Sequence, residues 1–157
     1  MGFDIHRLVK GRSLILGGVR IPHPKGLLGH SDADVVLHAL CDALLGAVGE
    51  GDIGTYFPDT DSRWENASSR IFVEKASELV RRRGLTVSNV DLVVLAQTPK
   101  IHPHREAIRK SVAKTLRVDS ARVNLKAKTM EGLGIIGAKG AIGTYAVVLL
   151  ESKRRRR

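Results

Sequence analysis

The chain has 157 residues, of which 43% are hydrophobic and 4% aromatic, and its formal net charge is +10. This length suits one domain with an aliphatic core and is too short for two, and the few aromatic residues argue against base stacking on a nucleic acid. Five of the positive charges lie at positions 153–157, so we expect one domain over residues 1–152 and a solvated basic tail over 153–157.

The sequence gives no sign of export or of membrane insertion. No apolar run approaches the roughly 20 residues that span a bilayer, and the first residues lack the apolar region of a signal peptide. The one cysteine, Cys41, excludes an intrachain disulfide and fits a reducing compartment. We therefore expect a cytoplasmic protein without a membrane partner, and we do not expect nucleic acid to bind.

The first half of the chain predicts a short hairpin followed by a helix. Residues 14–21 read as two short β-segments around a Gly-Gly turn, and a loop then runs to Gly29. A helix is predicted from Ser31 as its cap, because apolar residues follow at helical spacing up to position 48. Asp34, His38 and Asp42 are four residues apart and share another face of this helix.

The second half alternates between helices and strands. Residues 49–66 are rich in glycine and acidic residues and predict a long loop. Helices are predicted over 67–83 and 103–116, and strands over 90–96, 123–128 and 142–150. This order indicates an α/β protein, an α+β sandwich in which helices pack on one face of a mixed sheet.

Three residues suggest a catalytic zinc site. Asp4 and His6 are two positions apart, so on a strand they point to the same side, and His38 lies on the predicted helix. Three oxygen and nitrogen ligands leave the fourth position of a tetrahedral ion open for water or substrate. The alternatives are that Asp4 and His6 are an ordinary pair of side chains facing solvent, and that His38 is an ordinary histidine on a partly polar helix. Asp34 or Asp42 is expected to orient the second ring nitrogen of a ligand.

Other polar residues are candidates for phosphate and cation binding. His30 and Ser31 precede the predicted helix, where anions are favoured, although Ser31 needs no ligand if it only caps the helix. Asp52, Asp59 and Asp61 suit hydroxyl groups or a hard cation, but aspartates also form turns without a ligand.

A further candidate segment ends the strand predicted over 123–128. Lys126, Lys128, Thr129 and Glu131 stand before a glycine-rich stretch. Hydroxyl and N–H groups there suit a phosphate, and Glu131 suits a magnesium ion.

Taken together, these segments resemble the 2-C-methyl-D-erythritol 2,4-cyclodiphosphate synthase family over nearly the whole chain. The motifs that carry the resemblance are ordered along the sequence: 2–7 (GFDIHR), 17–22 (GGVRIP), 29–34 (GHSDAD), 38–40 (HAL), 51–54 (GDIG), 57–61 (FPDTD), 89–91 (NVD), 96–100 (AQTPK) and 126–129 (KAKT).

The resemblance implies a role for each matching residue. Asp4, His6 and His38 would bind zinc, Glu131 would bind magnesium or manganese, and His30 and Thr129 would stabilise the transition state. The methylerythritol phosphate part would contact two of the zinc ligands, Asp4 and His6, together with His30, Ser31, Asp52, Ile53, Gly54, Phe57, Pro58, Asp59, Thr60 and Asp61. The cytidine diphosphate part would contact Ala96, Gln97, Thr98, Pro99, Lys100, Ile101, His102, Lys128, Thr129, Met130, Glu131 and Ile135.

The resemblance also implies the reaction and the assembly. The substrate would be 4-diphosphocytidyl-2-C-methyl-D-erythritol 2-phosphate, whose own 2-phosphate attacks the β-phosphorus and expels CMP, in a homotrimer with active sites between subunits. Relatives commonly carry a few residues before the position of Gly2, so we expect a short or frayed first strand. The alternatives are a metal-dependent phosphoesterase and an RNA-binding module that uses the basic tail.

Overall fold

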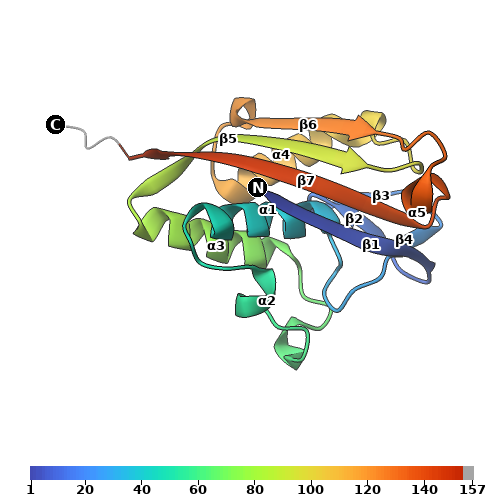
Figure 1. The fold of residues 1–157 in the computed structure, drawn as a ribbon, viewed down its shortest axis with the longest axis horizontal. Helices are drawn as coiled ribbons and strands as arrows, with labels where there is room; N and C mark the ends of the chain where they lie inside the picture. Colours follow the sequence, from blue (N-terminus) through green and yellow to red (C-terminus); the bar gives the residue numbers. More distant parts are fainter. Residues whose placement is uncertain (154–157) are drawn as a thin grey trace.

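A mixed five-stranded sheet forms the frame of the structure, a computed structural model that describes residues 1–153 (Figure 1). Its strands, in spatial order, are β4 (Lys25–Leu27), β1 (Gly2–Lys10), β7 (Ala141–Ser152), β5 (Leu85–Leu95) and β6 (Val123–Lys128). The β5–β6 pair is parallel and the other pairs are antiparallel. A separate hairpin joins β2 (Leu14–Leu16) to β3 (Val19–Ile21).

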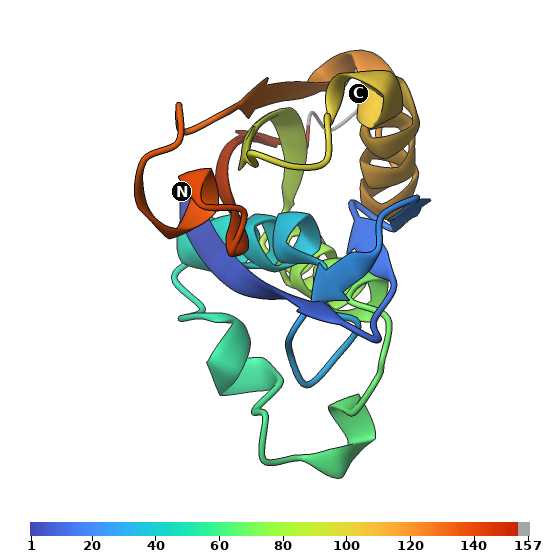
Figure 2. The ribbon, with the colours of Figure 1, turned by 90° about the vertical axis from the view of Figure 1, so that its right-hand side faces the viewer.

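Three helices cover one face of this sheet: α1 (Val35–Ala47), α3 (Arg70–Arg82) and α4 (Arg105–Leu116). Figure 2 shows them on the same side, and their buried residues join those of the strands in one hydrophobic core. Short helical turns complete the fold at α2 (Ile53–Tyr56), α5 (Gly134–Gly137), Ser62–Trp64, His102–His104 and Ser120–Arg122. The expected helix-covered mixed sheet is confirmed. Among residues 1–153, no helix has the length and apolar character needed to cross a membrane.

The first helix begins at Val35, so the prediction of a helix capped by Ser31 is wrong. Ala33 has a φ of 56°, a left-handed conformation that no helix can continue through. Asp34 is the true cap, and its carboxylate accepts hydrogen bonds from the amides of Val36 and Leu37. The Ser31 hydroxyl instead accepts a hydrogen bond from the Ala33 amide.

The first strand is neither short nor frayed, contrary to expectation. All six residues from Gly2 to Arg7 pair with β7, and Gly2 lies opposite Ala146. A Cβ atom at Gly2 would lie 2.1 Å from the Ala39 carbonyl oxygen of α1, so glycine lets this strand approach the helix closely. Asp4 and His6 are therefore held on a central part of the sheet, against the helix that carries His38.

Two other segments hold more regular structure than predicted. The expected loop over 49–66 contains α2 and the turn at Ser62–Trp64, and it projects from the rest of the molecule in Figure 1. Strand β5 begins at Leu85, five residues before the predicted start, because its first half pairs with the end of β7. The proposed tail beyond position 153 lies outside the described residues.

The face of the sheet opposite the helices carries a row of exposed apolar side chains. On β7 the exposed positions alternate, with Tyr145, Val147 and Leu149 at 40%, 49% and 61% exposure. Phe3 and Ile5 of β1 are 42% and 40% exposed on the same face, and the rings of Phe3 and Tyr145 are 4.5 Å apart. We call these five residues the apolar sheet face. Contiguous exposed apolar surface of this kind marks an interaction site.

Candidate functional site

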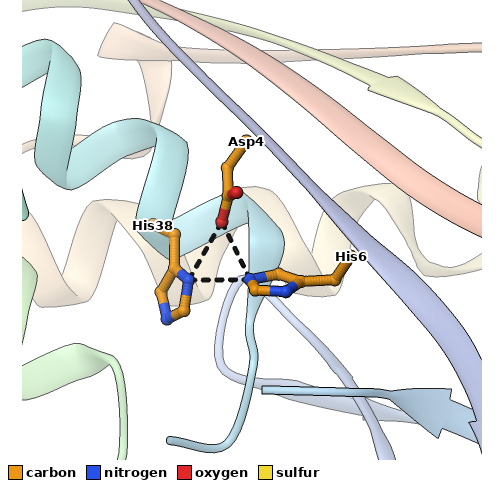
Figure 3. Close-up of side chains that lie close together, drawn as sticks. All are labelled: Asp4, His6 and His38. Carbon is orange, nitrogen blue, oxygen red and sulfur yellow. Dashed lines mark hydrogen bonds and ion pairs between the residues drawn. The ribbon is translucent and has the colours of Figure 1, made fainter. Parts of the chain in front are cut away.

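Asp4, His6 and His38 meet between β1 and α1 (Figure 3). Asp4 Oδ2 lies 2.9 Å from His6 Nε2 and 3.0 Å from His38 Nδ1, and the two nitrogens are 3.0 Å apart. Their side chains are between 12% and 27% exposed. The three atoms thus converge on one point, as the spacing on β1 predicts, and neither alternative of unrelated residues fits this arrangement.

The electrostatics of this triad suit a bound cation. Burial alone raises the pKa of the Asp4 carboxyl, but hydrogen bonds from His38 and His6 outweigh it and hold that pKa well below its usual range. Asp4 is therefore an anion at neutral pH beside two imidazoles. One carboxylate oxygen and two imidazole nitrogens are a donor set that zinc accepts, and three ligands leave a fourth position open.

The predicted partners of His38 are wrong. Asp34 is fully buried beneath the start of α1, where its carboxylate accepts hydrogen bonds from the amides of Gly17 and Gly18. Asp42 Oδ1 accepts a hydrogen bond from the Ile53 amide at 2.7 Å. The four-residue spacing places both aspartates on the same helix face as His38, but each carboxylate accepts hydrogen bonds from nearby backbone amides instead of contacting the His38 ring.

Two serines meet the second ring nitrogen of His38 instead. Its Nε2 lies 2.9 Å from Ser69 Oγ and 3.1 Å from Ser31 Oγ. Ser69 precedes α3 and comes from a part of the chain far from His38 in sequence. No periodicity or motif in the sequence indicates this contact, because only the packing of α3 against α1 brings it about.

A cavity of about 470 Å³ opens beside the triad. His6 and His38 line it, and so do seven of the residues predicted to hold the methylerythritol phosphate part: His30, Ser31, Ile53, Gly54, Phe57, Pro58 and Asp59. The His30 ring is fixed by a 3.1 Å contact between its Nε2 and the Asp61 carbonyl oxygen. Thr60 and Asp61 do not line the cavity, and Asp52 serves as the cap of α2.

Aromatic side chains that the sequence did not assign to the site form one wall of this cavity. Trp64 and Phe72 line it together with the predicted Phe57, and the Phe57 and Phe72 rings are 4.4 Å apart. Phe72 has the spacing of a core residue of α3, which conceals its second role. The cavity therefore joins an apolar wall to a polar end where the triad lies.

The residues predicted for the cytidine diphosphate part gather elsewhere, where β5 and β6 end side by side. The Ala96 amide donates to the Lys128 carbonyl oxygen, and the Met130 amide donates to Gln97 Oε1 at 3.3 Å. The Thr129 hydroxyl donates to Glu131 Oε1 at 2.7 Å. The other members of this group are Thr98, Pro99, Lys100, Ile101 and His102, with Ile135 exposed on the nearby α5.

This second group has its own cavity of about 320 Å³, lined in part by Ile101, His102 and Lys128. It shares no lining residue with the cavity beside the triad. Within residues 1–153 of one chain, the two groups predicted to hold one substrate thus form two separate half-sites.

Comparison with known proteins gives consistent matches along the chain. The YgbB family model matches residues 1–151. The chain is 53% identical over 150 residues to the 2-C-methyl-D-erythritol 2,4-cyclodiphosphate synthase of Shouchella clausii, covering 96% of this chain and 94% of that protein.

Solved structures agree with this match. A 2C-methyl-D-erythritol-2,4-cyclodiphosphate synthase in its CDP-bound form superposes with a TM-score of 0.88 at 46% identity, covering 96% of this chain and 97% of the other. The bifunctional IspDF of Campylobacter jejuni superposes with a TM-score of 0.93 at 43% identity. That match covers 97% of this chain but 41% of the longer bifunctional protein.

Proposed function

The chain belongs to the YgbB family and has 2-C-methyl-D-erythritol 2,4-cyclodiphosphate synthase activity, a phosphorus–oxygen lyase reaction, and we propose that a zinc ion held by Asp4, His6 and His38 serves it. The observation that carries this proposal is the convergence of three ligand atoms, each 2.9 or 3.0 Å from the next. An ion held by these three residues would supply Lewis acidity, which draws charge from a phosphate oxygen of the substrate.

The substrate divides between the two half-sites in this proposal. The methylerythritol phosphate part lies in the cavity beside the triad, where His30, Ser31 and the segment 52–61 surround it. The cytidine diphosphate part lies against residues 96–102, 128–131 and Ile135. The relative of known structure with CDP bound supports a site for this nucleotide in the family. Glu131 would hold magnesium or manganese there, since its carboxylate is a hard oxygen ligand.

We infer that the working enzyme is a homotrimer whose active sites lie between subunits. Two observations support this assembly. The half-sites of one chain do not share a cavity, so we place the two halves of one active site on different chains. The apolar sheet face is uncovered in one chain, and packing three such faces together around an axis would bury it.

His30 and Thr129 are the residues proposed to stabilise the transition state. The His30 ring reaches the cavity beside the triad and is fixed by the Asp61 carbonyl. The Thr129 hydroxyl points to Glu131 in the other half-site. Each would meet negative charge that grows on the diphosphate as the 2-phosphate of the same substrate attacks the β-phosphorus and CMP leaves. No protein nucleophile takes part, so the chain acts by positioning and by electrostatics.

Phosphorus NMR of the purified protein with 4-diphosphocytidyl-2-C-methyl-D-erythritol 2-phosphate tests the proposal. With zinc and magnesium supplied, we expect signals of a cyclic diphosphate and of CMP in equal amounts. A chelator that strips zinc should abolish both. Release of inorganic phosphate without a cyclic product would indicate the phosphoesterase alternative, and full turnover by protein shown to contain no zinc would refute the role of the triad.

A further inference from the structure

Asp32, Ser69 and His38 form a hydrogen-bonded chain that ends at the metal-binding triad. Ser69 Oγ lies 2.9 Å from His38 Nε2 and also contacts Asp32 Oδ1 closely. The Ser69 amide donates to Asp32 Oδ2 at 3.1 Å, so Asp32 contacts both the side chain and the main chain of Ser69. Ser69 is fully buried. These contacts lie on the side of His38 that faces away from Asp4 and His6.

The hydroxyl of Ser69 does not cap α3, although Ser69 stands at the capping position. Ser69 is the cap residue of α3, where a serine hydroxyl normally accepts a hydrogen bond from an amide of the first turn. Its side chain makes no such bond here. The hydroxyl contacts His38 and Asp32 instead, so capping of α3 does not explain why a serine stands at this position.

Asp32 is itself held firmly by the surrounding backbone. Its amide donates to the Ala67 carbonyl oxygen at 2.9 Å, and its Oδ1 also accepts a hydrogen bond from the Asp34 amide at 3.2 Å. The two amides that contact the Asp32 carboxylate, those of Asp34 and Ser69, are both donors. The carboxylate therefore stays an acceptor toward Ser69.

These contacts determine the direction of the hydrogen bonds from Asp32 through Ser69 to His38. An ionised carboxylate only accepts, so the single hydroxyl hydrogen of Ser69 goes to Asp32. The oxygen of Ser69 is left to accept a hydrogen bond from His38, which requires the proton of the neutral ring to be on Nε2. The lone pair is then on Nδ1, the atom that an ion held between Asp4 and His6 would bind, whereas without an ion Asp4 competes for a proton at this nitrogen. A metal ion needs this lone pair.

We propose that Asp32 and Ser69 are positioning residues that fix His38 in the tautomer and orientation needed to bind the metal ion. The inference rests on the proposed zinc site and adds to it the residues that prepare one ligand before the ion arrives. Ser31 Oγ, 3.1 Å from the same nitrogen, already accepts the Ala33 amide and lacks a carboxylate partner of its own in these contacts.

The decisive variant is Ser69→Ala, with Ser77→Ala as its matched control. Ser77 is also buried on α3, and within residues 1–153 its hydroxyl has no hydrogen-bond partner. Zinc affinity is measured by competition with a chromogenic chelator, after circular dichroism shows that each variant is folded. We expect zinc affinity about 10- to 100-fold lower for Ser69→Ala, unchanged affinity for Ser77→Ala, and recovery with Ser69→Thr, which keeps the hydroxyl.

A second substitution tests the direction of these hydrogen bonds. Asp32→Asn places an amide that can donate to Ser69, which would turn the hydroxyl hydrogen toward His38 Nε2 and favour the wrong tautomer. We expect zinc affinity at least as low as in Ser69→Ala. Nitrogen-15 NMR of the metal-free proteins should show a smaller fraction of His38 with its proton on Nε2 in both variants than in the wild type.

The outcomes separate this inference from the proposed function. If the wild type binds no zinc, or His38→Ala still binds it stoichiometrically, the proposed metal site itself is wrong. If the wild type binds one zinc per chain through His38, two results overturn only the positioning role. One is unchanged zinc affinity in Ser69→Ala. The other is a His38 tautomer population that is the same in the metal-free wild type, Ser69→Ala and Asp32→Asn.

Discussion

Tyr145→Glu should separate the proposed trimer into folded single chains. Tyr145 lies at the centre of the apolar sheet face, where its neighbours across the strands are Phe3 and Val93. No acidic or basic residue stands opposite it in either strand pair, so a carboxylate buried there by assembly would have no partner. In a single chain, where this side chain is 40% exposed, the new carboxylate can still reach water.

The size of the effect follows from burial and charge. Assembly would bury the exposed two-fifths of the ring, about 80 Å² and about 2 kcal/mol. An unpaired buried charge adds about 3 kcal/mol or more. The sum of about 5 kcal/mol per subunit weakens each contact by roughly 10³-fold or more.

Light scattering coupled to size-exclusion chromatography measures the mass of the assembly. The matched control is Ile71→Glu, since Ile71 is an apolar residue of α3 with 46% exposure on the other side of the molecule. We expect a trimer for the wild type and the control, and single chains without cyclase activity for Tyr145→Glu. A Tyr145→Glu protein that keeps the trimeric mass at micromolar concentration would show that this face is not the interface.

Three further results are expected. His38→Ala should lose stoichiometric zinc and cyclase activity but keep the trimer, as metal analysis and light scattering would show; bound zinc at wild-type level would remove His38 from the ligands. Asp34→Ala should lower the free energy of unfolding by about 3 kcal/mol in urea titrations, because it leaves the buried amide of Gly17 and the partly buried amide of Gly18 unpaired and uncaps α1. A loss below about 1 kcal/mol would contradict this. In the presence of chelator, folding lowers the pKa of Asp4, so the ionised Asp4 stabilises the protein above its ordinary pKa of 3.8, and this stabilisation is lost as the pH falls below that value. The melting temperature of the wild type should therefore fall more between pH 6 and pH 3 than that of Asp4→Asn. Equal falls would refute this prediction.

The metal-binding triad could be predicted because its signal is local. A two-residue spacing on a strand puts Asp4 and His6 on one side whatever the strand pairs with, and His38 belongs to a helix with clear apolar periodicity. The sequence could not show that β1 is a long strand, since six of its residues gain their partners from β7, at the far end of the chain.

The surroundings of the triad escaped prediction because they depend on competition between contacts. Asp34 and Asp42 have the right spacing to support His38, yet both bind nearer backbone amides. Ser69 takes their place only because α3 packs against α1, more than thirty residues along the chain. The aromatic wall of the cavity has a similar origin, since Phe72 serves the core and the site together.

The claim that each active site takes its two halves from different chains is tested most directly by mixing two inactive variants. His38→Ala removes the metal half, and Thr129→Ala removes the other half. After unfolding and refolding together in equal amounts, random trimers should contain intact sites at about one quarter of the interfaces. We therefore predict recovery of about a quarter of the wild-type cyclase activity, from two proteins that are each inactive alone. If mixed trimers form and no activity returns, both halves belong to one chain and the shared site is wrong.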